Sequence, residues 1–169
     1  MPDKAVQEKI TRLLQAHRIM TLATLRPDGW PHATTVSYVN HGLALFCFVS
    51  RLSQKFINIS RDPRVSIAIA GDFSAPSEIR GLSFAARAHV VEDGIVFDRV
   101  WDMVLQRFPE YAAWPKPLSP LTVLLRLDPE IAALVDYSRA FGHSELVTLA
   151  DGEPAQARAA DSDWLGRPR

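Results

Sequence analysis

Several residue types that define common chemistries are scarce or absent in this chain. Its 169 residues include one cysteine, so the chain can form no internal disulfide and offers no pair of thiolates to a metal. Its eight glycines form neither a Gly-x-Gly-x-x-Gly fingerprint nor a Gly-Lys-Ser/Thr loop. The sequence therefore excludes the Rossmann and P-loop modes of nucleotide binding.

The chain also carries no excess of charge of either sign. The 19 basic and 19 acidic residues balance, and no long basic block is present, so we expect no nucleic-acid partner. The apolar runs have the length of strands, and the first residues lack the apolar core of a signal peptide. We therefore predict a cytoplasmic protein that does not associate with membranes.

The histidines form no recognisable metal or catalytic motif. None stands in a His-x-x-x-His pair, and no serine lies in a nucleophile-elbow pattern, so neither a zinc site nor a hydrolytic triad is supported. We predict no metal ligand. The five positions are His17, His32, His41, His89 and His143.

The single cysteine, Cys47, lies inside the apolar run 43–49, which is typical of a buried strand. An apolar setting raises the pKa of a thiol and makes it a poor nucleophile. We therefore interpret Cys47 as a core residue.

Periodicity and turn signals predict a mainly β chain with flanking helices. The first strands are joined by turns of hairpin length, which favours an antiparallel barrel of six to seven strands over a doubly wound sheet. Predicted helices cover 3–18, 54–60 and 95–108, and predicted strands cover 19–25, 30–39, 43–49, 64–70, 78–92, 121–127 and 130–137.

Composition divides the chain into a body and a tail. We predict one domain over residues 1–150, and a weakly ordered tail over 151–169 that is rich in alanine and charge. Within that tail, Trp164 and Leu165 are candidates for docking onto the body or onto a second subunit.

The predicted strand 64–70 has one bulky face and one flat face, because isoleucine and valine alternate with serine and alanine. Two interpretations are open. The flat face packs closely against another part of the barrel, or it receives a partner or ligand.

Polar residues gather where the strand 43–49 gives way to the predicted helix 54–60. Ser53 is a candidate helix cap, and the free N–H groups of a first helical turn favour an anion. Lys55 and Arg51 add full positive charges beside them, and Ser50 adds a second hydroxyl. This segment predicts a phosphate site, the alternative being a solvated helix start.

Four segments resemble the flavin-binding split barrels of the pyridoxamine 5'-phosphate oxidase family. Residues 19–32 are similar to that family's opening hairpin, with an Asp-Gly turn followed by a proline. Residues 46–67 resemble its phosphate strand, short helix and following strand. Residues 82–91 resemble its fifth strand, although Ala86 replaces a common glycine, and residues 136–143 resemble the ending of a bacterial subgroup.

The resemblance implies a split-barrel homodimer that holds FMN in clefts at the subunit interface. Lys55, Gln54 and Ser53 would meet the 5'-phosphate, with Ser50 and Arg51 beside them. Residues that would line the isoalloxazine ring or the ribityl chain are Thr34, Thr35, Val36 and Ser37 on one strand, and Phe48 and Val49 on another. The chain departs from the family where Gln54 and Thr34 replace arginine, and it shows no clear vitamin-phosphate pocket.

The resulting prediction is an FMN-dependent oxidoreductase that acts on an unidentified small-molecule substrate. We name no catalytic residue, because flavin chemistry needs no particular side-chain acid or base. One alternative is a deazaflavin-dependent reductase, with Arg80 and Arg87 as candidate partners of its acidic tail. Another is a module without turnover that binds flavin, or binds haem through His32, His89 or His143, and a third is a purely structural barrel.

Overall fold

The computed structural model describes residues 4–149 and 155–159. The helices are α1 (Lys4–Ala16), α2 (Gln54–Arg61) and α3 (Gly94–Arg107), with short 3-10 helices η1 (Pro76–Glu78) and η2 (Pro109–Ala113). The strands are β1 (Ile19–Leu25), β2 (Pro31–Ser37), β3 (Val39–His41), β4 (Ala44–Ser50), β5 (Arg64–Ala70), β6 (Arg80–Val90), β7 (Thr122–Asp136), β8 (Ser144–Thr148) and β9 (Ala155–Ala159). No helix in the described ranges is long and apolar enough to cross a membrane.

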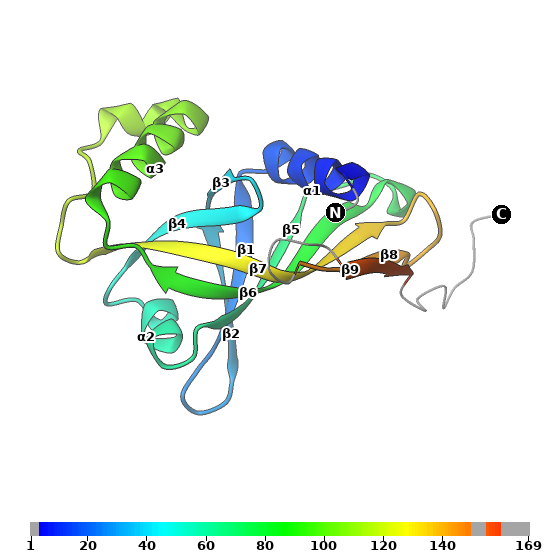
Figure 1. The fold of residues 1–169 in the computed structure, drawn as a ribbon, viewed down its shortest axis with the longest axis horizontal. Helices are drawn as coiled ribbons and strands as arrows, with labels where there is room; N and C mark the ends of the chain where they lie inside the picture. The colour runs from blue at the N-terminus through cyan, green and yellow to red at the C-terminus, as the bar shows by residue number, and fades with distance from the viewer. Residues whose placement is uncertain (1–3, 150–154, 160–169) are drawn as a thin grey trace.

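The described strands form one curled antiparallel sheet with the helices packed around it (Figure 1). Its main path runs β2-β1-β5-β6-β7-β4-β3, and β8 and β9 extend it by pairing beyond the far half of β7. The predicted fold class, a mainly antiparallel split barrel with flanking helices, is confirmed. Figure 1 places α2 and α3 at the same end of β4 and β7, on opposite sides of these strands.

The predicted strand 30–39 is two strands, because the pairing partner changes at Tyr38. Ser37 pairs with Ile19 of β1, whereas Val39 pairs with Phe46 of β4. The chain therefore bends here and passes from β2 into β3. The Tyr38 hydroxyl donates to the Leu14 carbonyl at 2.8 Å, which fixes the bend against the end of α1.

The two strands predicted over 121–137 are one long strand, β7, which continues through Pro129. Proline lacks an N–H for the ladder, and the register shifts between Ala85 and Ala86 of β6, where Pro129 pairs. Strand β8 was not predicted. Of the predicted tail, residues 155–159 pair with β8, while Trp164 and Leu165 lie outside the described residues.

Two apolar clusters stabilise the body, and β4 contributes to both. Cys47 and Val49 belong to the barrel core, which also takes up the buried face of α1. Phe46 belongs to a second cluster with residues of α3 and β7, and Phe48 packs against that cluster. Successive side chains of a strand point to opposite faces, so one strand can serve both clusters. The prediction that Cys47 is a core residue is confirmed.

Arg107 joins the end of α3 to the end of α1. Its guanidinium donates to the carbonyls of Leu14 at 2.6 Å and Gln15 at 3.3 Å, and also to that of His17. The last carbonyls of a helix lack partners within the helix, so this guanidinium satisfies groups that would otherwise need water. The position of α3 over the sheet therefore depends on Arg107.

We expect Arg107→Met to lower the free energy of unfolding by about 2–3 kcal/mol, because it removes several hydrogen bonds from one charged group. Urea unfolding measures the change. Arg99→Met is the matched control, since Arg99 is exposed on the same helix. Equal unfolding midpoints for the two variants would contradict the role given to Arg107.

Candidate functional site

A tight turn carries the chain from β4 into α2. The Ser50 carbonyl accepts from the Ser53 N–H at 3.0 Å and from the Ser53 hydroxyl at 2.6 Å, and the Ser50 hydroxyl accepts from the Leu52 N–H at 3.2 Å. Ser53 caps α2 as predicted, because its hydroxyl oxygen accepts from the Phe56 N–H. Both predicted hydroxyls thus help to build the turn.

Two of the polar side chains predicted for the phosphate site have protein partners. Arg51 donates through Nε to the Pro120 carbonyl at 3.3 Å, and its guanidinium carbon lies 5.3 Å from the centre of the Phe56 ring. The Gln54 amide donates to the Asn58 side chain at 2.8 Å. In this arrangement neither side chain is directed to a free position beside the helix start.

Lys55 is different. Its ammonium makes no ion pair or hydrogen bond within the described residues, although the side chain is partly buried. The backbone N–H groups of Gln54 and Lys55 also have no acceptor in the part of the chain that the structure describes. The start of α2 therefore offers one free cation and unpaired N–H donors, which is the donor set that a phosphate requires.

The far end of α2 is closed by Asp62. Its carboxylate accepts from the Arg64 guanidinium at 2.6 Å and from the Arg64 N–H at 3.1 Å. These bonds lower the pKa of Asp62 to about 2, so its negative charge is retained at neutral pH. The carboxylate at the far end of the short helix is thus already paired with a cation.

Strand β2 presents the second part of the predicted site. Val36 turns into the barrel core, as Val49 of β4 does, while Thr35 and Ser37 are exposed on the outer face. The buried Thr34 hydroxyl and the buried Nδ1 atom of His32 have no hydrogen-bond partner among the described residues. Buried polar atoms are normally satisfied, so these atoms fit a strand that receives a polar ligand.

Asn58, which sequence reasoning missed, fixes α2 against the barrel. Its side chain is fully buried, and its amide donates to the Thr24 hydroxyl at 2.9 Å while accepting from Gln54. The available signal was a polar residue between Phe56 and Ile59, on the apolar side of a short helix. The pattern alone does not distinguish such a residue from a solvated one.

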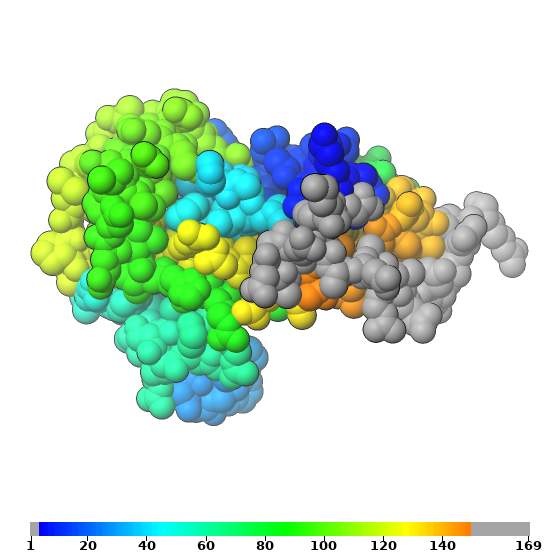
Figure 2. Space-filling model, in the orientation of Figure 1, coloured from blue at the N-terminus to red at the C-terminus, as the bar shows by residue number. Residues whose placement is uncertain are grey.

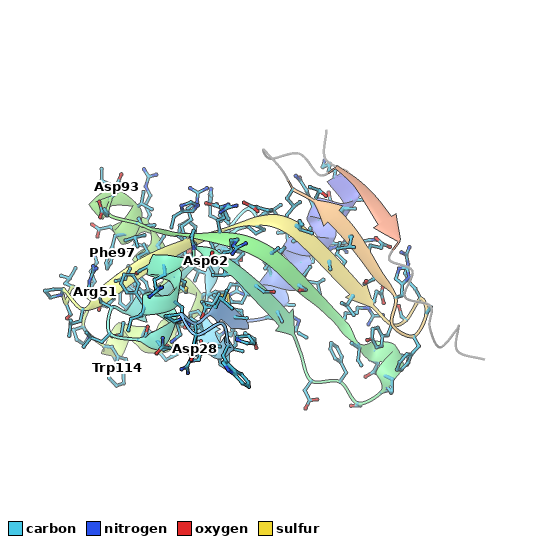
Figure 3. All side chains as sticks on the ribbon, turned by 90° about the horizontal axis from the view of Figure 1, so that it is seen from below. Asp28, Arg51, Asp62, Asp93, Phe97 and Trp114 are labelled. Carbon is cyan, nitrogen blue, oxygen red and sulfur yellow. The ribbon has the colours of Figure 1, made fainter. Side chains whose placement is uncertain are left out.

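An aromatic cavity of about 270 Å³ lies between β4, α3 and the loop after η2. It was not predicted, although Ser37 and Phe48 of the predicted site line it. The Phe48 ring packs edge-on against Phe97 and Trp101, with centroids 5.2 and 6.0 Å apart. Figure 3 shows Phe97 and Trp114 at the same end of the molecule as Arg51.

The remaining candidates have acidic neighbours. Arg80 lies 3.5 Å from Asp136, and Arg87 lies 2.6 Å from Glu130. His89 and His143 lie 3.7 Å from Asp128 and 3.4 Å from Glu145, respectively. Over the described ranges, no group of three or more His, Cys, Asp or Glu residues could hold a metal ion.

The family model described as pyridoxamine 5'-phosphate oxidase matches residues 6–136. The chain belongs to this family. The matched residues run from α1 to the end of β7 and include β2, β4 and α2, and the resemblance stated from the sequence is confirmed.

The chain is also similar to three known proteins. General stress protein 26 of Bacillus subtilis is 23% identical over 136 residues, covering 80% of this chain and 92% of the relative. A conserved hypothetical protein of Mycobacterium tuberculosis is 27% identical with a TM-score of 0.67, covering 81% and 86% of the two chains. The haem storage protein HutZ of Vibrio cholerae is 25% identical with a TM-score of 0.64, covering 77% and 92%.

We expect the Cys47 thiol to be unreactive in the native protein. Burial raises its pKa to about 12, although the charge of Lys55 opposes this rise. At pH 8 the thiolate is then on the order of one part in ten thousand of the thiol. An Ellman titration at pH 8 should detect no thiol in native buffer and one per chain in urea, whereas rapid reaction in native buffer would contradict the burial.

Proposed function

We propose that the protein is an FMN-binding oxidoreductase that works as a homodimer. The observation that carries the proposal is the free ammonium of Lys55 beside the unpaired N–H groups at the start of α2. Family membership supports the same position, because the residues that resemble the family's phosphate segment form this turn and helix. The substrate is a small molecule.

The chain's own residues would hold and orient the cofactor. Lys55 and the first turn of α2 would bind the phosphate, and Asn58 would keep that turn at a fixed position relative to β1. Backbone groups of Thr34 to Ser37 would line the ring, with the Thr34 hydroxyl as an additional hydrogen-bonding group. Bound FMN would supply hydride or electron transfer, which no side chain here provides.

The proposed dimer uses the flat outer face of β1, β2 and β5. Side chains across the middle of this face are small and uncharged: Thr21, Ala23, Ala33, Thr35, Ser66 and Ala68. The exposed Ile19 and Leu25 stand at the two ends of β1 on the same side. Such a face fits a second copy of itself, because flat surfaces without charge pack closely and lose little hydration.

We expect Lys55→Ala to weaken FMN binding roughly 10- to 150-fold, because one charge-assisted hydrogen bond contributes about 1.5–3 kcal/mol. Titration of flavin-free protein with FMN, followed by the quenching of flavin fluorescence, measures the affinity. Arg61→Ala is the matched control, because it removes one positive charge from the opposite end of α2. Equal losses in both variants would contradict a specific phosphate contact.

We expect Ala68→Arg to convert the dimer to a monomer, because it places two like charges in the middle of the proposed interface. Sedimentation velocity measures the state of assembly. The control is Gln106→Arg, which adds the same charge to an exposed position on α3. A monomeric wild-type protein, or a dimer that Ala68→Arg leaves intact, would contradict the proposed interface.

Haem is the second candidate ligand, favoured by the likeness to a haem storage protein. Among the histidines proposed as axial ligands, His143 is partly buried and faces Glu145, and a carboxylate partner increases the basicity of a ligating imidazole. For a deazaflavin, Arg80 and Arg87 would have to release Asp136 and Glu130 before meeting an acidic tail. The structure thus favours FMN over a deazaflavin.

A further inference from the structure

We propose that the aromatic cavity binds the substrate of this site, and that this substrate is a neutral, planar aromatic molecule of one or two rings. Naming the ligand as the substrate depends on the proposed function, while its chemical class follows from the cavity alone.

The wall of the cavity is aromatic and carries no charged side chain among the described residues. Its rings come from β4, from Tyr38 between β2 and β3, and from the stretch between α3 and the loop after η2: Tyr38, Phe46, Phe48, Trp101, Phe108, Tyr111 and Trp114. Rings pack best with other rings in edge or offset arrangements. A volume of about 270 Å³ is at the small end for ligand pockets, so it suits one or two fused rings.

The described cations on the α3 side of the cavity are engaged by protein groups. The guanidinium carbon of Arg107 lies 5.5 Å from the centre of the Tyr38 ring, but this guanidinium donates hydrogen bonds to the carbonyls at the end of α1. Lys116 lies over Phe97 and pairs with Asp98 at 2.5 Å. An anionic ligand would lose its hydration against a wall that carries no charged side chain among the described residues, which disfavours a phosphate or carboxylate here.

The same holds for Arg18 at the far wall. Its guanidinium carbon lies 4.9 Å from the Phe108 ring centre, it donates to the Arg107 carbonyl, and it lies 3.9 Å from Glu110. The polar groups that remain for a ligand are hydroxyls, since Ser37 and Tyr111 line the cavity. A neutral ring bearing oxygen could donate or accept one hydrogen bond here.

A large aromatic side chain at the mouth of the cavity is exposed to solvent. Trp114 is 69% exposed even though it lines the cavity, and it follows η2 directly, where its N–H donates to the Tyr111 carbonyl at 3.0 Å. A tryptophan held by its backbone at the edge of an aromatic cavity can cover a flat ligand. Figure 2 shows α3 and the segment after it as a lobe at one end of the molecule, beside β3 and β4.

The cavity and the proposed phosphate site are adjacent along one strand. Phe48 lines the cavity, and Ser50, two residues later, begins the turn into α2. Two residues of strand span about 7 Å. Because α2 and α3 lie on opposite sides of β4, the link between the two sites is Ser37, which lines the cavity and ends the strand proposed to hold the ring. A substrate in the cavity would therefore lie beside that ring.

The test uses two probes with the same ring system, 2-naphthol and naphthalene-2-sulfonate. Isothermal titration calorimetry of the full chain should show saturable binding of one 2-naphthol per chain, with the sulfonate roughly tenfold weaker or more. Trp114→Ala should weaken 2-naphthol binding about tenfold through the loss of a ring contact. Trp30→Ala, which removes a tryptophan that is 72% exposed, should leave the affinity unchanged.

Three results would overturn the proposal: no binding of 2-naphthol, equal affinity for the sulfonate, or equal losses in Trp114→Ala and Trp30→Ala. Repeating the titration with Lys55→Ala separates this proposal from the proposed function, because that variant should retain 2-naphthol binding while losing FMN. If wild-type protein binds 2-naphthol and never FMN, the assignment of the cavity to a flavin substrate fails. If it binds FMN and not 2-naphthol, the cavity proposal fails alone.

Discussion

The buried side chain of Asn58 is the interaction on which the site depends. It joins α2 to the barrel through Thr24 of β1 and braces Gln54 at the helix start, and it does so inside an otherwise apolar contact. Hydrogen bonds in such surroundings are strong and costly to leave unmade, so they specify one arrangement. The turn from Ser50 to Ser53 also holds this helix of eight residues, but on its packed face the other contacts are those of Phe56 and Ile59 with the barrel core, and apolar contacts alone do not fix a rotation.

Strand β4 organises everything around that helix. Its inward side chains complete the barrel core, its outward rings pack towards α3 and line the cavity, and its last residue begins the turn capped by Ser53. A single strand thus sets the distance between the proposed phosphate site and the aromatic cavity. The hydrogen bonds of Arg107 fix the opposite wall of the cavity, because they hold α3 in place relative to α1.

Much of the fold and part of the site could be predicted from the sequence. The Ser53 cap, the strands β1, β4 and β5 and the burial of Cys47 depend on local spacing, which the sequence displays directly. The break at Tyr38 and the continuity of β7 through Pro129 depend on how distant strands pair, and local patterns do not contain that information. The aromatic cavity forms only where α3 and the proline-rich loop pack against β4. Because these segments are far apart in the sequence, the sequence does not indicate that Trp101 and Trp114 line the same cavity.

Side-chain partners were also hidden from the sequence. Arg51, Gln54 and Lys55 are equivalent as polar residues at a helix start. In the structure Arg51 lies over Phe56 and Gln54 bonds to Asn58, so of these three only Lys55 has no partner within the described residues. Similarly, the sequence gives no partner for Arg80 and Arg87, which in the structure pair with carboxylates on the neighbouring strand β7. Only the positions of these side chains in the structure distinguish the candidates that are free to bind a ligand from those that are already paired.

The visible absorption spectrum of the purified protein, with mass spectrometry of any small molecule released on denaturation, tests the central claim most directly. We predict a flavin absorption spectrum, either in the protein as purified or after addition of FMN, and release of FMN when the protein is denatured. A haem spectrum, or a colourless protein that fails to bind added FMN, would contradict it.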